Sequence, residues 1–197
     1  IDTSIIQKNI KEMIYESSFI LPDLVYNSFS RMHFNETSEL GKETLKVLIE
    51  NADIAKNEQI PLCQDCGVVV IFLELGQRVT LTGAPVEDAI NLAVKDTYKE
   101  YSLRKSVVDD PLQRKNTGTN TPCFIHTDIT EGNECKVTVY IKGGGSENMS
   151  TLKMFRPTDS REYIIKWIKE SIIEAGPNPC PPIYLGIGIG GTADIAA

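Results

Sequence analysis

The sequence predicts an α/β protein in which an N-terminal helical layer is followed by a mixed β-sheet region flanked by helices. In the first third of the chain, apolar residues recur at the spacing of helices that bury one face. Residues 68–73 (VVVIFL) instead form a continuous β-branched apolar run, which is typical of a buried strand. No repeat, low-complexity tract or linker divides the 197 residues, so we expect a single α/β domain over residues 1–197.

Three helices are predicted in the N-terminal layer. The first begins at Ser4, which forms a capping-box pattern with Gln7. Pro22 suits the first turn of the second helix, predicted over residues 21–32. The third helix is predicted over residues 38–56, where one apolar stripe would face the rest of the layer.

The elements after residue 73 are predicted from helical spacing and from the alternation typical of strands. Further strands are predicted at residues 79–82, 123–129, 136–142 and 183–185, and helices from Pro85 and over residues 160–175. We expect the strands at 123–129 and 136–142 to form a pair around a turn at Gly132. Residues 104–121 show no periodicity and form a polar loop that is too long for a simple connection.

The composition argues against several kinds of binding partner and against several cellular locations. The formal net charge of −7 argues against nucleic acid or an anionic membrane surface as a partner. No apolar run approaches the roughly 20 residues of a membrane-spanning helix, and no signal peptide is recognisable, so we expect a cytoplasmic protein. The five cysteines are an odd number, which favours free thiols over disulfides. These thiols are Cys63, Cys66, Cys123, Cys135 and Cys180.

The segment Cys63-Gln64-Asp65-Cys66-Gly67 admits several interpretations. A zinc site would need a second pair of cysteines or spaced histidines, and the sequence has neither. A redox-active dithiol is expected at the start of a helix, whereas this pair precedes a strand and has an acidic residue between its sulfurs. Two alternatives remain: Cys63 ligates a metal cluster at the tip of a loop, or both cysteines pack as small apolar residues.

Cys180 lies in the segment Pro179-Cys180-Pro181-Pro182, where prolines on both sides hold the thiol on a rigid loop. Proline beside a ligating cysteine recurs at iron–sulfur sites, although a proline turn around a core cysteine would give the same pattern. Cys123 and Cys135 fall in predicted strands, and we interpret them as packing residues.

The loop at residues 104–121 gathers four cations in an acidic protein. A guanidinium such as that of Arg104 binds a carboxylate bidentately, which suits a dicarboxylate ligand. We expect Asp109 and Asp110 to orient the neighbouring cations through ion pairs. The alternative is a solvated loop whose charges cancel.

Two glycine-rich segments could also approach a ligand. Gly143, Gly144 and Gly145 could offer backbone amides to an anion, or form a plain flexible turn. The glycines at 186, 188 and 191 match a dinucleotide-binding pattern, which requires a strand before them and a helix after them.

Taken in order, these motifs resemble the class I, oxygen-sensitive fumarate hydratases and the α subunit of L-tartrate dehydratase. The matching segments are LCQDxG, LRxSVVDDP, RKNTGxNTP, KGGGSEN and GPNPCPP, which lie between about residues 61 and 194. One departure is Cys66, where the family usually has Thr. This departure leaves Cys63 in place but adds a neighbouring thiol that could oxidise.

The resemblance implies a hydro-lyase that reversibly hydrates fumarate to malate in the tricarboxylic acid cycle, with L-tartrate dehydration as an alternative. It implies a 4Fe–4S cluster with one open iron, bound by Cys63, Cys180 and a third cysteine that we expect beyond Ala197. A different class of function, a nucleotide-binding or regulatory module that uses glycines 186–191, is a further alternative.

The resemblance also assigns roles around the substrate. Gln64, Asp65, Arg104, Gly144 and Gly145 are expected to contact the dicarboxylate, and Asp65 is the candidate for proton transfer to or from water. Further groups are expected from a β subunit or C-terminal domain within a homo- or hetero-oligomer. This chain alone is therefore expected to be inactive.

Overall fold

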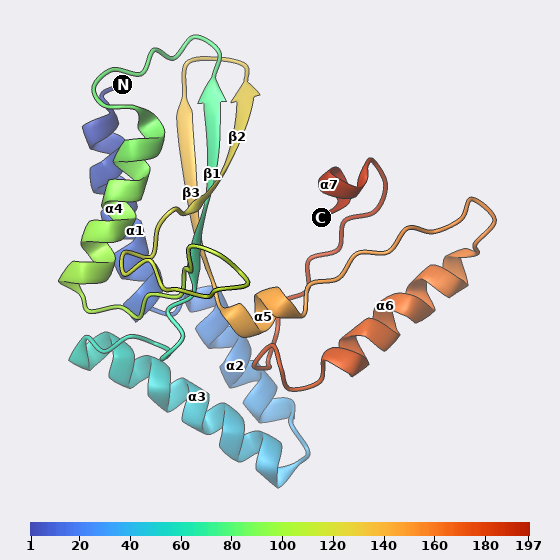
Figure 1. Ribbon diagram of the computed structural model, residues 1–197. Coiled ribbons are helices and arrows are strands. Elements are labelled where there is room, and N and C mark those ends of the chain that lie inside the picture. The colour runs from blue at the N-terminus through green and yellow to red at the C-terminus, as the bar shows by residue number, and fades with distance from the viewer. The chain divides into compact units, whose positions relative to one another are not determined.

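The computed structural model describes residues 1–197 (Figure 1). Contacts divide the chain into two compact units, Ile1–Lys142 and Gly143–Ala197, which we describe one at a time. The expectation of one domain over residues 1–197 stays a prediction. The α/β class is confirmed, since helices at the N-terminus precede a small mixed sheet.

Four helices belong to the first unit: α1 (Thr3–Phe19), α2 (Asp23–Asn35), α3 (Glu39–Glu58) and α4 (Val86–Glu100). The cap of α1 is Asp2, whose carboxylate accepts from the N–H of Ser4 at 2.9 Å, so the capping box predicted at Ser4 is wrong by two residues. Ser38 caps α3 by accepting from the N–H of Gly41. A short polar side chain at each position satisfies an N–H group that the first helical turn leaves unpaired.

The sheet has the order β2-β1-β3, with β1 (Val68–Gly76) between β2 (Phe124–Thr130) and β3 (Cys135–Lys142). β1 pairs in parallel with β2 and antiparallel with β3. The predicted pairing of residues 123–129 with 136–142 is therefore wrong. The end of β1 bonds to residues at the end of β2 and just before β3. The N–H of Gly76 donates to the Glu134 carbonyl and the N–H of Gln77 donates to the Thr130 carbonyl, both at 2.8 Å.

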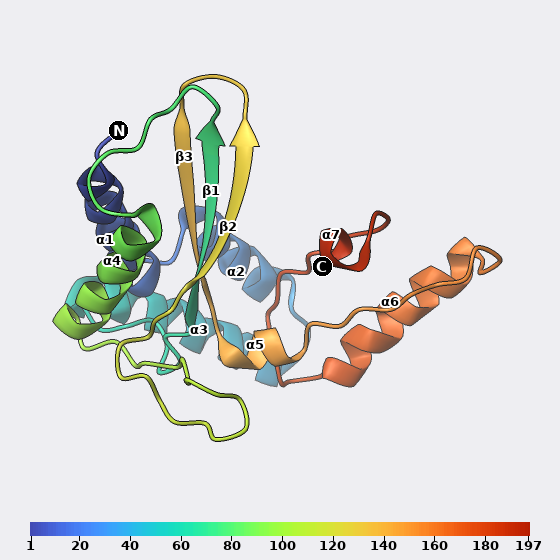
Figure 2. The same ribbon diagram turned by 45° about the horizontal axis from the view of Figure 1, so that its top comes forward.

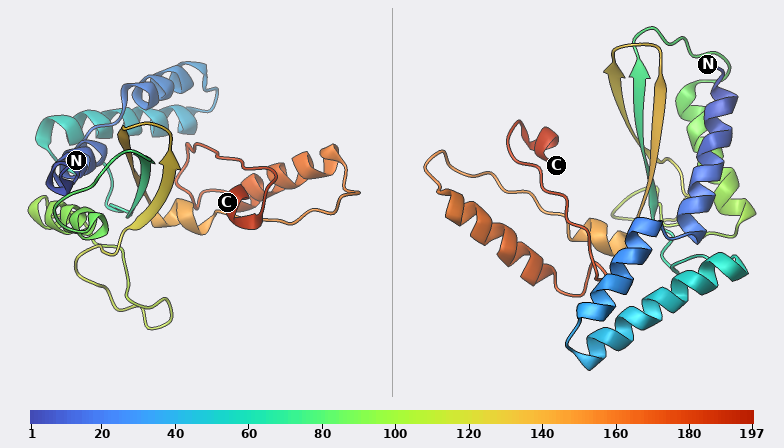
Figure 3. Two further views of the ribbon diagram at one scale, coloured as in Figure 1. Left: turned by 90° about the horizontal axis from the view of Figure 1, so that it is seen from above. Right: turned by 180° about the vertical axis from the view of Figure 1, so that it is seen from behind.

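One face of the sheet carries the core. Val69 and Ile71 of β1 are fully buried in one cluster with Ile10 of α1 and with Ile90 and Val94 of α4. Figure 3 shows α1 and α4 side by side along this face. Each fully buried side chain of this kind stabilises the fold by about 1.5–3 kcal/mol. The predicted buried strand is present as β1, and its opposite face is open within this unit, with Phe72 41% exposed.

Two predicted strands do not form. Residues 79–82 contribute only an isolated bridge, in which Thr82 pairs with Asp2. Gly83, with φ +94°, then turns the chain away toward α4, so a longer ladder cannot continue. Residues 183–185 adopt no regular structure. Their apolar run is too short to form a strand without a neighbour, and the three strands of the sheet all lie in the first unit.

The second unit contains α5 (Gly144–Asn148), α6 (Arg161–Ala175) and α7 (Ala193–Ala196). The segment Gly143-Gly144-Gly145, expected as a loop or turn, instead begins the short helix α5. The limits predicted for α6 are confirmed: Ser160 caps its start, and Gly176, with φ +52°, ends it. No helix in either unit is both long enough and apolar enough to span a membrane.

Candidate active site

The first part of the candidate site is the 63–67 loop, which joins α3 to β1. Its anchor is Leu62, whose N–H donates to the Ser18 carbonyl and whose carbonyl accepts from the Asn51 amide, both at 2.9 Å. The side chains of Cys63 and Gln64 are exposed, whereas Cys66 and Gly67 are buried. The loop therefore holds its last residues in the core and presents its first residues outward.

Hydrogen bonds within the 63–67 loop form a tight turn around the first thiol. The N–H of Asp65 points at the Cys63 sulfur at 3.4 Å, and the N–H of Gly67 donates to the Asp65 carboxylate at 3.1 Å. Gly67 has φ +62°, a conformation that a residue with a Cβ adopts only at a cost. This turn fixes the directions of the Cys63 thiol and of the half-buried Asp65 carboxylate together.

The Cys66 thiol is 8% exposed and acts as an internal hydrogen-bonding group. It accepts from the backbone N–H of Arg104 at 3.3 Å and donates to the Cys63 carbonyl at 3.6 Å. Burial raises the pKa of the Cys66 thiol, and the Arg104 N–H offsets only part of that effect. A redox-active dithiol needs a lowered thiol pKa, so this environment argues against that interpretation of the pair.

The second part of the site is the 104–121 loop, which follows α4 and passes the start of β1 (Figure 2). Its link to the 63–67 loop is the buried side chain of Asn120. The Asn120 carboxamide oxygen accepts from the N–H groups of Ser106 at 2.6 Å and Val107 at 3.3 Å. The Asn120 amide nitrogen donates to the Gly67 carbonyl at 3.2 Å.

Two further contacts support this junction. The hydroxyl of Tyr98, on α4, donates to the Cys66 carbonyl at 2.6 Å, and burial raises the pKa of Tyr98, so the hydroxyl remains a donor. The hydroxyl of Ser106 donates to the Asp65 carboxylate at 3.4 Å. Asp65 and the backbone of Arg104 are thus held within one hydrogen-bonded network, with the Arg104 residue itself exposed.

The ion pairs predicted for the 104–121 loop are not present. Asp110 instead accepts from the N–H groups of Leu112 and Gln113, at 2.9 and 2.7 Å, and so stabilises a turn of its own loop. The short side chain of aspartate commonly accepts from backbone N–H groups of a local turn in this way. The cations of the loop are therefore not oriented by Asp110.

The second unit brings together the other predicted residues. Cys180 is exposed, has φ +57°, and its N–H donates to the Pro177 carbonyl at 3.0 Å. A Cβ placed on Gly145 would lie only 2.7 Å from the Asn178 carbonyl oxygen. Gly145 and the start of α5 therefore pack backbone to backbone against the loop that carries Cys180, and only glycine permits this approach.

The structure thus assembles the predicted residues in two groups. Cys63, Gln64, Asp65 and Arg104 share one network in the first unit, and Gly144, Gly145 and Cys180 share one neighbourhood in the second. No group of three or more His, Cys, Asp or Glu side chains is placed to hold a metal ion. The meeting of the Cys63 and Cys180 sulfurs at one cofactor stays a prediction.

The environments of the five thiols separate candidate ligands from packing residues. Cys63 and Cys180 are the two exposed thiols. Burial raises the pKa of Cys66 and Cys135, and raises that of Cys123 to about 11. Iron–sulfur clusters bind thiolates, so two accessible thiols fit such a group and the three more buried ones fit it poorly.

Sequence reasoning missed Tyr98 and Asn120. Tyr98 follows Val94 by four residues, so helical spacing alone could have placed it on the buried face of α4. Asn120 has φ +59°, and its position in an Asn-Thr-Gly-Thr-Asn segment is compatible with that conformation. Nothing local shows that its partners are Ser106, Val107 and Gly67.

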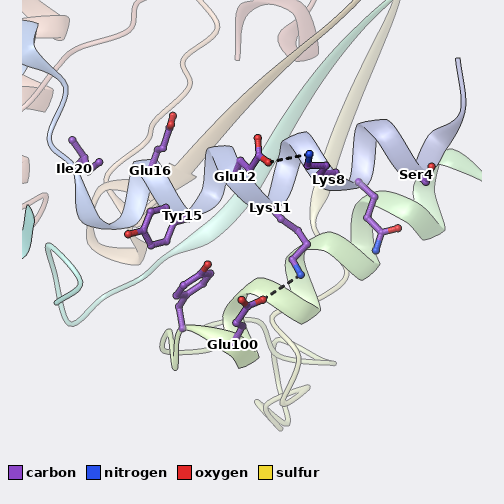
Figure 4. Close-up of a pocket in the computed structure, with 10 residues that line it drawn as sticks. Ser4, Lys8, Lys11, Glu12, Tyr15, Glu16, Ile20 and Glu100 are labelled. Carbon is purple, nitrogen blue, oxygen red and sulfur yellow. Dashed lines mark ion pairs between the residues drawn. The ribbon is translucent and has the colours of Figure 1, made fainter. Parts of the chain in front are cut away.

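One hollow of the surface lies elsewhere, between α1 and α4 (Figure 4). It has a volume of about 500 Å³, and the ion pair of Lys11 with Glu100, at 3.2 Å, crosses it. None of the predicted site residues lines it. Both of its lysines already pair with glutamates, Lys8 with Glu12 and Lys11 with Glu100, so we assign it no ligand.

Comparison with known proteins identifies relatives. The family model described as Fumarate hydratase (Fumerase) matches residues 7–197. A Methanocaldococcus jannaschii protein, provisionally named L(+)-tartrate dehydratase subunit alpha, is 42% identical over 194 residues, covering 95% of this chain and 67% of that protein. The L(+)-tartrate dehydratase subunits alpha of Escherichia coli (strain K12) and Shigella sonnei are each 29% identical over 180 residues, covering 90% of this chain. The chain spans 59% of the length of each of these two relatives.

Proposed function

The chain belongs to the fumarate hydratase (Fumerase) family, and from that premise we propose that it is the N-terminal part of a hydro-lyase subunit that reversibly hydrates fumarate to malate. The observation that carries the proposal is the network in which the 63–67 loop, with Cys63 and Asp65, is joined to Arg104 through the Cys66 thiol. This network brings the Cys63 thiol, the Asp65 carboxylate and the backbone of Arg104 into one small region.

The proposed cofactor is a 4Fe–4S cluster with one open iron. Cys63 and Cys180 would hold it, because these are the two exposed thiols of the chain. A third cysteine would come from protein beyond Ala197. When bound, an open iron supplies Lewis-acid activation of the substrate hydroxyl as a leaving group.

The side chains of this chain would bind and orient the substrate. The exposed guanidinium of Arg104 can hold a carboxylate bidentately, while its backbone is tied to Cys66. Gln64 is exposed beside Cys63 and can donate a further hydrogen bond. The first amides of α5, at Gly144 and Gly145, can donate to a second carboxylate of the substrate.

Asp65 is the proposed group for proton transfer at the water molecule that is added or removed. One of its carboxylate oxygens accepts from the Gly67 N–H and the Ser106 hydroxyl, which fixes the orientation of the carboxylate. General acid–base catalysis by one oriented group contributes about 10²–10⁴-fold to a rate. Replacing Asp65 with Asn keeps the accepting oxygen and removes the proton transfer.

The relatives that match this chain are named as alpha subunits, which supports a β subunit as partner. We propose that this β subunit, or an equivalent C-terminal domain, completes the active site within an oligomer in the cytoplasm. Because the chain covers only part of its relatives, residues 1–197 alone are proposed to be inactive.

L-tartrate dehydration is the second candidate activity, and the names of the same relatives favour it. The test is to reconstitute the full-length assembly anaerobically with iron and sulfide and to measure dehydration of L-malate and L-tartrate separately. Greater kcat/KM for malate supports the first candidate, and greater kcat/KM for tartrate supports the second. Nucleotide binding without dehydration of either acid would contradict both, although the strand that a dinucleotide site requires before Gly186 is absent.

A further inference from the structure

Asn120 is a fully buried polar side chain in a part of the molecule that is otherwise mostly exposed loop. Its carboxamide has three backbone partners: the N–H groups of Ser106 and Val107 and the carbonyl of Gly67. These partners lie 14, 13 and 53 residues away along the chain. One side chain therefore joins the loop that carries Arg104 to the loop that carries Cys63 and Asp65.

The chemistry of the position calls for asparagine. The backbone has φ +59°, and Asn tolerates this left-handed conformation better than most residues with a Cβ. A carboxamide can accept two N–H groups at its oxygen and donate from its nitrogen at the same time. Aspartate would keep the acceptor but would place a negative oxygen against the Gly67 carbonyl. An apolar side chain would leave all three backbone groups buried without this partner.

We propose that Asn120 is a positioning residue that sets Arg104 in its place relative to Cys63 and Asp65. It touches neither substrate nor cofactor and acts through the backbone at Ser106, Val107 and Gly67. The catalytic consequence rests on the proposed function, whereas the link between the two loops does not.

The link is tested by amide hydrogen exchange on the full-length chain. In the unsubstituted protein, the amides of Ser106 and Val107 should exchange at least about tenfold more slowly than the same residues in an unstructured peptide, because both are hydrogen-bonded to the buried Asn120 side chain. The variant Asn120→Asp should speed exchange in the 63–67 loop by at least about tenfold through loss of the bond to Gly67.

A matched control is Asn116→Asp in the same loop. Asn116 is exposed and bonds only within its own loop, to the Lys105 carbonyl and the Gly118 N–H, so this variant should leave exchange at residues 63–67 unchanged. Amides of α1 report whether each variant keeps the fold. The inference is overturned if the amides of Ser106 and Val107 are unprotected in the unsubstituted protein. It is also overturned if residues 63–67 exchange at the same rate in a folded Asn120→Asp variant as in the unsubstituted protein.

The catalytic consequence has a separate measurement in the reconstituted assembly. A loss of alignment of about 1 Å costs about 10²-fold, so Asn120→Asp should lower kcat/KM for the dicarboxylate by about that factor with a raised KM. Asn116→Asp, which keeps the bonds of Asn120, should lower kcat/KM less than Asn120→Asp does. An active assembly in which Asn120→Asp lowers only the melting temperature would contradict the positioning role. Failure of the unsubstituted assembly on malate and tartrate would defeat the proposed function, and the exchange result would still decide whether Asn120 links the loops.

Discussion

The backbone N–H of Arg104 donates to the buried sulfur of Cys66 at 3.3 Å, across 38 residues of sequence. This contact ties the residue proposed to bind the substrate carboxylate to the segment that presents Cys63 three positions earlier. The thiol at Cys66 is therefore a structural acceptor rather than an incidental neighbour of the proposed ligand.

The acceptor role of Cys66 predicts different effects for two substitutions of similar size. Cys66→Val removes the acceptor and leaves the Arg104 N–H without it, which should lower the free energy of unfolding by about 1–3 kcal/mol. Cys66→Thr retains an oxygen that can accept and should have a smaller effect. Urea unfolding of the full-length chain measures both, and equal losses would show that packing, not the hydrogen bond, matters at this position.

The thiols are predicted to differ in their rates of alkylation. In protein without a cluster, iodoacetamide at about pH 8 should modify the exposed Cys63 and Cys180 at least about tenfold faster than Cys66, because the thiolate is the nucleophile and the Cys66 pKa is raised. Mass spectrometry of peptides over time gives the rates. Faster modification of Cys66 than of Cys63 would contradict the burial and pKa described for this loop.

Cys123 is predicted to make the fold sensitive to alkaline pH. Burial raises the pKa of its thiol from 9.0 to about 11, so between these values the unfolded chain has lost the proton and the folded chain retains it. The free energy of unfolding should then fall as pH rises, by about 1.4 kcal/mol per pH unit from this group. Below pH 9 the contribution of the Cys123 thiol to the free energy of unfolding should be constant.

The matched variant for this effect is Cys123→Ala, measured by urea unfolding from pH 8 to pH 11. Its free energy of unfolding should fall less steeply with pH than that of the unsubstituted chain, because the other buried thiols and Tyr98 titrate alike in both. Parallel pH profiles would show that Cys123 does not keep its proton in the folded state.

Gly145 is predicted to be intolerant of a side chain. In Gly145→Ala, the new Cβ would meet the Asn178 carbonyl oxygen at 2.7 Å, so either α5 or the loop that carries Cys180 must move. We expect a loss of about 1–3 kcal/mol in the free energy of unfolding. Gly186→Ala is the control, because nothing lies within 4 Å of a Cβ at that position. Equal melting temperatures for the two variants would count against the packing described for the second unit.

Local sequence patterns predicted the helices well but did not predict the pairing of the strands. Helical spacing placed α3 and α6 within about two residues of their observed ends, since caps such as Ser38 and Ser160 act locally. The order β2-β1-β3 depends on which strand enters between two others. That choice depends on contacts across more than 60 residues, such as Glu74 with Lys136, which no local pattern reveals.

In the candidate site, too, local motifs could be predicted and long-range contacts could not. Cys63, Asp65 and Arg104 stand in sequence motifs whose chemistry is recognisable residue by residue, so they could be predicted. The groups that hold them, Tyr98 and Asn120, act through bonds that span 32 and 53 residues. The predicted ion pairs of Asp109 and Asp110 failed for a related reason, since nearby backbone N–H groups offered Asp110 better-placed partners.

Cluster retention in serine variants of the full-length assembly tests the central claim most directly. After anaerobic reconstitution, Cys63→Ser and Cys180→Ser should each lose the visible iron–sulfur absorbance and the bound iron, because each removes one thiolate ligand. Cys135→Ser, at a half-buried thiol that packs against the core, should retain both. Retention of the cluster in the first two variants, or equal loss in all three, would contradict the proposal that Cys63 and Cys180 bind one shared cofactor.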